Sequence, residues 1–119
     1  MITKTTEQLI QEKGLTAPRV TPQDLQDNIV SEHYFTGMNG VVGAAGLNTV
    51  RHAPELDLLT FCVLVLRNGF TVTGESACAS PENFNAEIGR KIARENAEQK
   101  IWPLMGYHLK QQLSEDSDL

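Results

Sequence analysis

Residues 69–107 read GFTVTGESACASPENFNAEIGRKIARENAEQKIWPLMGY, and this stretch decides most of the expected fold. Its first residue completes the dipeptide Asn68-Gly69, which is typical of a two-residue type I′ turn. That turn would join the apolar run 58–66 to the run 70–76, so the sequence predicts a β-hairpin.

A helix is expected directly after the hairpin. Ser-Pro-Glu at 80–82 supplies a hydroxyl cap, a proline at the first helical position and an acid in the first turn. Apolar side chains then recur every three to five positions, at Phe84, Ile88, Ile92, Ala97, Ile101, Leu104 and Leu109. Because Pro103 removes a backbone donor, we expect a kinked helix, with one part near 81–101 and a continuation near 103–113.

The run 58–66 is apolar on both faces of its pleat, so we expect a central strand that is covered on both sides. A two-residue turn places Val65 opposite Val72 and Val63 opposite Gly74. Gly74 then leaves room for the close approach of a second backbone or a ligand.

The N-terminal part of the chain predicts further elements. Residues 1–20 read as an N-terminal helix and a connector, and a capped helix at 22–29 follows. Residues 30–36 predict a strand, in which Tyr34 and Phe35 point to opposite faces.

The segment 37–56 begins with a glycine at every third position, from Gly37 to Gly46, and we interpret this glycine run as a flexible loop or a tight glycine-lined crossing. No Lys-Ser/Thr pair follows these glycines, so the segment is not a phosphate-binding P-loop. Residues 48–54 would add a fourth strand at the sheet edge, and the acidic tail 114–119 is expected to be disordered.

Length and charge limit the classes of protein. The chain has 119 residues, which suits a single domain over 1–119, and its formal net charge is −5, which disfavours binding to DNA or an anionic membrane. No apolar segment approaches the ~20 residues of a transmembrane helix. The N-terminus lacks the apolar core of a signal peptide, so we expect a protein of the host cytoplasm.

Catalytic and metal-binding motifs are not apparent. Two cysteines do not make a disulfide framework, and the histidines have no partner at a metal-ligand spacing, so no metal and no cofactor are expected. Cys78, just before the predicted helix start, is a candidate nucleophile, but a small buried residue at that junction is the plainer interpretation. We therefore expect that the protein is not an enzyme and that it has no catalytic residues.

A helix N-terminus is a general binding site for phosphate, and here small polar side chains surround the predicted one: Thr73, Ser76, Ser80 and Asn83. Helix capping by Ser80 and sheet positions for Thr73 and Ser76 account for the same pattern. Arg90, Lys91 and Arg94 form the densest basic patch, although i,i+4 pairing with glutamates explains it equally as a solvated face.

Other side chains are candidates for a ligand's charge or for stacking on a purine. The cations are Arg19, Arg51 and Arg67, and the aromatic residues are Tyr34, Phe35, Phe84 and Trp102.

The run from Asn68 to Tyr107 resembles the signature of a small tailed-phage family, the "gene forty-nine / gene sixty-six" family of coliphages and Shigella phages. The segment TPQDLQDNIVSEHYF at 21–35 resembles the family's N-terminal half. The resemblance also implies overlap with the Thoeris anti-defence proteins, which sequester cyclic ADP-ribose-type and cyclic oligonucleotide immune signals. In those proteins the ligand enters recessed pockets at a subunit interface and is not cleaved.

By this resemblance the ligand-binding candidates are Thr73, Ser76, Asn83, Phe84, Arg90 and Arg94. The chain departs from the family pattern at Asn85, where Asp is expected. Compared with shorter members of the family, residues 37–56 resemble an insertion. Both departures bear on the identity of the ligand.

The sequence thus predicts an α+β fold, in which a small antiparallel sheet of three or four strands is packed by a long kinked C-terminal helix and a short N-terminal helix. A sheet this small leaves apolar surface, which favours a dimer or higher homo-oligomer. The expected function is a phage protein that sequesters a cyclic nucleotide signal. A module that binds and redirects a host protein is the alternative, and a cysteine-dependent enzyme is a weaker third.

Overall fold

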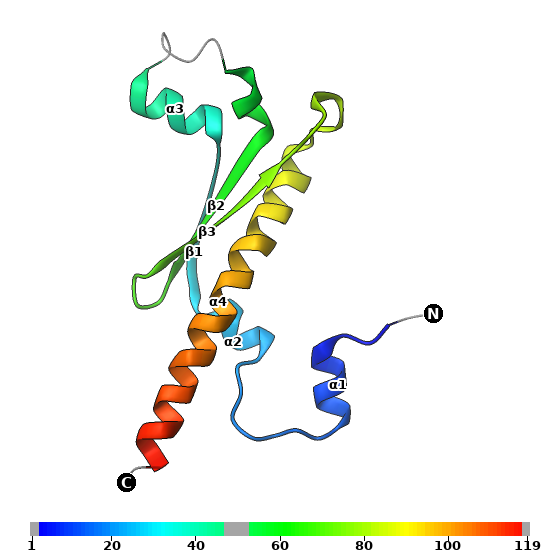
Figure 1. The fold of residues 1–119 in the computed structure, drawn as a ribbon, viewed down its shortest axis with the longest axis vertical. Coiled ribbons are helices and arrows are strands. Elements are labelled where there is room, and N and C mark those ends of the chain that lie inside the picture. The colour runs from blue at the N-terminus through cyan, green and yellow to red at the C-terminus, as the bar shows by residue number, and fades with distance from the viewer. Residues whose placement is uncertain (1–2, 47–52, 118–119) are drawn as a thin grey trace.

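The computed structural model describes residues 3–46 and 53–117. The elements of this part, in chain order, are α1 (Thr6–Glu12), α2 (Pro22–Asp27), β1 (Ile29–Thr36), α3 (Gly37–Ala45), the 3-10 helix η2 (Pro54–Leu58), β2 (Leu59–Leu66), β3 (Thr71–Ala77), the 3-10 helix η3 (Pro81–Asn83) and α4 (Ala86–Ser117). The strands form one antiparallel sheet in the order β1-β2-β3, and α4 runs along it (Figure 1). The predicted α+β fold is therefore confirmed, with three strands among the described residues.

Helix α4 packs on the sheet through small residues. Its buried positions are Gly89, Ala93, Ala97 and Ile101, which lie four residues apart along one face. Opposite them lies Gly74 of β3, where an added Cβ would overlap the carbonyl oxygen of Ala93 and the backbone nitrogen of Ala97. The close approach predicted at Gly74 is thus an approach of the α4 backbone, and it sets the distance between helix and sheet.

The core lies between α4 and the facing side of the sheet. The buried apolar residues are Leu25, Cys62, Leu64, Leu66, Val72, Ala93, Ala97 and Ile101. Ile29, Tyr34, Trp102 and Met105 pack around them. Tyr34 therefore faces the core, whereas Phe35, one residue on, is 38% exposed, as the strand prediction requires.

The hairpin between β2 and β3 has a different turn and register from the ones predicted. The amide of Gly69 donates to the carbonyl of Leu66 at 2.9 Å, and Gly69 alone in the loop has a positive φ, +88°. This geometry is a three-residue loop, in which a turn is followed by a glycine in the left-handed region. The extra residue shifts the pairing by one, so Leu64 faces Val72 and the predicted register is wrong.

Within residues 3–46 and 53–117, a helix layer covers one face of the central strand β2, so the expected cover on both sides is wrong for this part of the chain. Thr60, Cys62, Leu64 and Leu66 face α4 and are buried. The alternate side chains of β2 remain partly exposed on the other face.

The predicted helix start at 80–82 is also wrong. Residues Pro81–Asn83 form a single 3-10 turn, and Ser80 makes no side-chain capping bond. Helix α4 begins at Ala86, where the side-chain oxygen of Asn85 accepts from the amide of Ile88 at 3.0 Å. The chain therefore uses Asn85 as its cap, five residues later than the sequence indicated.

Helix α4 continues through Pro103 to Ser117 as one element, so the long C-terminal helix and its continuation after the proline are confirmed. Trp102 and Met105 pack against the core on either side of the proline, and this packing holds the helix together where one backbone donor is missing. The helix includes residues 114–117, where the acidic tail was expected to be disordered.

The glycine-rich segment contains a helix, α3, where a loop or crossing was expected. Thr36 and Asn39 form a reciprocal cap, with the side chain of each accepting from the amide of the other, at 3.0 and 2.9 Å. Gly37 lies against Leu56, which a side chain would crowd. The expected fourth strand at 48–54 falls mostly on 47–52, outside the described residues, and Pro54 begins η2.

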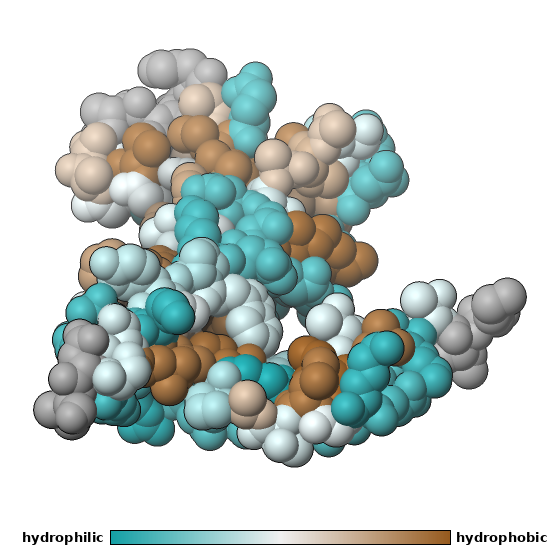
Figure 2. Space-filling model, turned by 60° about the horizontal axis from the view of Figure 1, so that its bottom comes forward, coloured by the Kyte–Doolittle hydropathy of each residue, from teal (hydrophilic) through white to brown (hydrophobic). Residues whose placement is uncertain are grey.

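The N-terminal arm, residues 3–18, extends away from the rest of the molecule (Figures 1 and 2). Its helix α1 begins at a reciprocal cap between Thr5 and Gln8 and contains no buried residue. The radius of gyration is 18.9 Å, whereas a compact chain of this length has about 13.5 Å. The chain is therefore much more extended than a compact domain.

Candidate ligand-binding pocket

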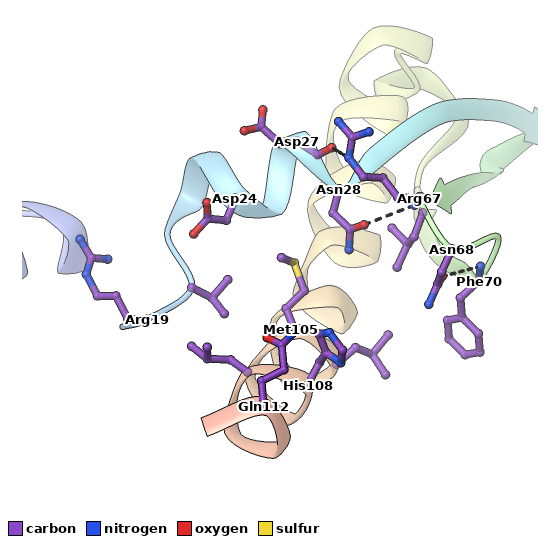
Figure 3. A pocket seen from close by; sticks show the side chains of 14 residues that line it. Arg19, Asp24, Asp27, Asn28, Arg67, Asn68, Phe70, Met105, His108 and Gln112 are labelled. Carbon is purple, nitrogen blue, oxygen red and sulfur yellow. Dashed lines mark hydrogen bonds between the residues drawn. The ribbon is translucent and has the colours of Figure 1, made fainter. Parts of the chain in front are cut away.

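A pocket of about 660 Å³ opens where α2, the β2-β3 loop and the C-terminal half of α4 meet (Figure 3). Its apolar lining consists of Val20, Leu66, Phe70, Leu104, Met105 and Leu109, and its polar lining of Arg19, Asp24, Asp27, Asn28, Arg67, Asn68, His108 and Gln112. Pockets that hold small molecules usually have about 300–1,000 Å³ and a similar mixture of apolar surface and a few polar groups.

Local hydrogen bonds fix the upper wall of the pocket. Thr21 and Asp24 cap α2 reciprocally, each at 3.0 Å. At the other end of α2, the backbone carbonyl of Asn28 accepts from the amide of Arg67 at 3.0 Å. The Nε of Arg67 also donates to the carbonyl of Asp27 at 2.7 Å. The hairpin loop is therefore tied to the end of α2, although the two are about 40 residues apart in sequence.

The lower wall comes from one face of α4. Met105, His108 and Gln112 are spaced three and four residues apart and point from α4 toward α2, while Asn28 points back toward them (Figure 3). Phe70 lies at the edge, on the hairpin, and is 55% exposed. An aromatic ring in this position offers a flat apolar surface on which a planar ligand can stack.

The charged groups of the pocket are mixed. Arg19 donates to both carboxylate oxygens of Glu7, at 2.7 and 2.8 Å, and with a further bond from Gln11 this lowers the pKa of Glu7 from 4.5 to about 2. The pKa of Asp24 is lowered by the hydrogen bonds from the backbone and hydroxyl of Thr21. The terminal nitrogens of Arg67 have no hydrogen-bond partner in the described part of the chain. Arg67 is therefore a positioned cation with donors available to a ligand.

The residues predicted as ligand-binding do not line this pocket. Thr73 is exposed on the sheet face away from α4, while Ser76 lies two positions from Gly74 on the α4 side. Asn83 is exposed at the end of η3, and Phe84 follows it and lies near Gly89. Helix α4 begins at Ala86, later than predicted, and Phe84 lies close to its first turn. The ligand role of these four residues stays a prediction.

In the basic patch on α4, Lys91 pairs with Glu95 and Arg94 is paired as well. Arg94 forms ion pairs with Glu32 and Glu98 and donates to the side chain of Gln26 at 2.9 Å. Arg90, one turn earlier, is exposed. The contacts with Glu32 and Gln26 join α4 to β1 and α2, whereas the pair with Glu98 is of the i,i+4 kind that the spacing of charges indicated.

Both cysteines lie in surroundings typical of structural residues, since Cys62 is buried and Cys78 is partly buried. Cys62 is buried, and burial raises the pKa of its thiol. The Cys78 sulfur donates to the carbonyl of Ser80 at 3.2 Å. Within 3–46 and 53–117 no group of three or more His, Cys, Asp or Glu side chains is arranged to hold a metal ion. In the same ranges, no helix has the length and apolar character needed to cross a bilayer.

Sequence reasoning had considered Arg19 and Arg67 individually but missed Asn28, Phe70 and His108. The helical spacing of His108 with Met105 was a usable signal for a shared face, and Phe70 follows the turn directly. Arg51, another candidate, lies outside the described residues.

A family profile described as "Phage protein (N4 Gp49/phage Sf6 gene 66) family" matches residues 20–113. The match covers most of the chain, so the chain belongs to this family of phage proteins. No curated protein and no solved structure matches it. The matched range contains every pocket residue except Arg19, whereas α1 lies outside it.

Proposed function

We propose that this phage protein binds a cyclic nucleotide immune signal of the host in the pocket between α2, the hairpin loop and α4. In this proposal the signal is of the cyclic ADP-ribose or cyclic oligonucleotide class, and the protein sequesters it in the host cytoplasm without cleaving it. The protein acts as a homo-oligomer, needs no cofactor and is not an enzyme.

The pocket is the observation that carries this proposal. Its volume of about 660 Å³ suits a ligand of nucleotide size. Phe70 and the apolar wall offer surfaces for a base, and the available donors of Arg67 suit a phosphate oxygen. No Cys or Ser is among the described residues that line the pocket. Sequestration fits this lining, because binding a signal without cleaving it requires no nucleophile. The resemblance to anti-defence proteins supports the choice of ligand class.

Thermal unfolding against cyclic ADP-ribose isomers, cyclic dinucleotides and cyclic trinucleotides tests the proposal. A ligand present at a hundred times its Kd stabilises the native state by about 2.7 kcal/mol, which raises Tm by several degrees. We expect a shift with one class and recovery of the intact compound after heat denaturation of the protein. A shift followed by recovery of a cleaved product would contradict sequestration.

Phe70→Ala and Tyr107→Ala make a matched pair for locating the site. Both side chains are exposed aromatics, at 55% and 75%, but only Phe70 lines the pocket. We expect Phe70→Ala to abolish most of the ligand-induced shift and Tyr107→Ala to retain it. Equal loss in both variants places the ligand elsewhere. No shift with any compound favours the alternative, a module that binds a host protein, and affinity capture of one stoichiometric partner would then identify it.

A further inference from the structure

One ion pair ties the N-terminal arm to the residues that follow it. Arg19 donates to both carboxylate oxygens of Glu7, at 2.7 and 2.8 Å. In the described ranges, every other hydrogen bond or ion pair of residues 3–18 stays inside the arm. Helix α1 has no buried residue either. The position of α1 therefore depends on the pair between Glu7 and Arg19.

The same arginine belongs to the pocket. Arg19 lines both the pocket of about 660 Å³ and a second hollow of about 400 Å³ beside the arm, so the two spaces share its side chain. Figure 3 shows the guanidinium of Arg19 turned toward α1 and away from Met105 and His108. Arg67 lies on the opposite side of the pocket, and its terminal nitrogens are available to a ligand.

The pair with Glu7 withholds the charge of Arg19 from the pocket. Asp24 and Asp27 also line the pocket, so Arg67 is the one lining arginine whose charge no carboxylate in the described part of the chain neutralises. An anion in this space is attracted by Arg67 and repelled by the two aspartates. A freed Arg19 adds a second cation to the lining and so favours the binding of an anion.

We propose that Arg19 is a two-position switch, which holds the arm through Glu7 and releases it by turning to a phosphate group of a ligand in the pocket. The inference rests on the proposed function only in that the pocket takes a phosphorylated ligand, and it adds a regulation of that site. A guanidinium binds carboxylate and phosphate with the same bidentate geometry, so the exchange keeps both hydrogen bonds. Because linkage is reciprocal, arm attachment and ligand weaken each other by the same factor.

The ion pair is weak enough for a ligand to displace Glu7. The side chains of Arg19 and Glu7 are 25% and 29% exposed, and ion pairs in contact with water contribute little to stability. Protonation does not open the pair near neutral pH, since hydrogen bonds from Arg19 and Gln11 lower the pKa of Glu7 to about 2. At neutral pH a competing anion is therefore what opens the switch.

An NMR titration of the full-length protein with inorganic pyrophosphate tests the switch. Glu7→Gln frees Arg19, so we expect it to lower the Kd for pyrophosphate about threefold, the change that loss of an exposed ion pair produces. It should also raise the mobility of residues 6–12 in nitrogen-15 relaxation. Glu12→Gln is the matched control, because it removes the same charge from α1 but breaks only the exposed pair with Lys4. Equal Kd values in all three proteins, or equal tightening in both variants, overturn the switch.

Arg19→Gln separates the role of this side chain from that of net charge. In an Arg19→Gln background, Glu7→Gln should no longer change the Kd for pyrophosphate, and a tightening that persists there overturns the switch. In the unmodified protein, pyrophosphate should mobilise residues 6–12, and binding that leaves the arm fixed also contradicts the inference. Pyrophosphate that releases the arm while no cyclic nucleotide raises Tm supports the switch and overturns only the ligand class of the proposed function.

Discussion

The two halves of α4 have the same secondary structure but opposite surroundings. Residues 86–101 pack against the sheet through Gly89, Ala93, Ala97 and Ile101, and the backbones of helix and strand almost touch. Residues 102–117 run beyond the sheet, and none of them is fully buried. There Leu104, Met105, His108, Leu109 and Gln112 border the pocket. The first half determines the fold, and the second half offers a wall to a ligand.

Gly74→Ala should have the largest effect, because it breaks the tight half of this comparison. The added methyl would overlap the backbone atoms of Ala93 and Ala97, which cannot rotate aside as a side chain can. Overpacking usually costs about 1–3 kcal/mol, and we expect at least about 4 kcal/mol here or failure to fold. Denaturant unfolding measures this loss.

Gly106→Ala is the matched control in the other half of α4. No atom lies within 4 Å of the Cβ that it would add, so the substitution should stabilise the helix by up to about 1 kcal/mol. Similar losses at the two glycines would show that the two halves of α4 are equally packed.

Ile101→Ala and Leu109→Ala sharpen the same comparison at intermediate size. Ile101 is 0% exposed in the core, so its truncation should cost about 3 kcal/mol in the free energy of unfolding. Leu109 is half-buried at the pocket wall, and we expect a loss of about 1 kcal/mol. Urea unfolding of both variants gives the difference, and a larger loss at Leu109 would mean that the pocket wall belongs to the core.

The smallest effect on stability is expected where the N-terminal arm joins the rest of the chain. There Arg19 pairs with Glu7 and lines the pocket together with the second half of α4. The pKa of Glu7 is lowered to about 2, so its ion pair contributes above the ordinary value of 4.5 and is lost as pH falls from 4.5 toward 2. A carbon-13 NMR titration of the Glu7 carboxyl should give a midpoint near 2. Arg19→Gln should move the midpoint of Glu7 toward 4.5. If Glu7 of the wild-type protein already titrates near 4.5, the ion pair with Arg19 is absent.

Local sequence chemistry was sufficient where neighbouring residues decide the structure. The cap at Thr21 correctly predicted the start of α2, and the alternation of Tyr34 and Phe35 correctly predicted opposite faces of β1. It was insufficient at 80–85, where two caps compete, because Ser80 and Asn85 both precede helix-compatible residues. It also missed α3, whose cap uses Asn39 where Glu or Gln is the familiar partner.

The sequence by itself determined the α+β class and the hairpin between two apolar runs. These follow from turn chemistry and side-chain periodicity, which act over a few residues. Only the tertiary structure decided the register, since one extra loop residue exchanges the two faces of a strand. It also decided the pocket, because Arg19, Arg67 and His108 come from distant segments whose meeting depends on how the α4 backbone packs against the sheet.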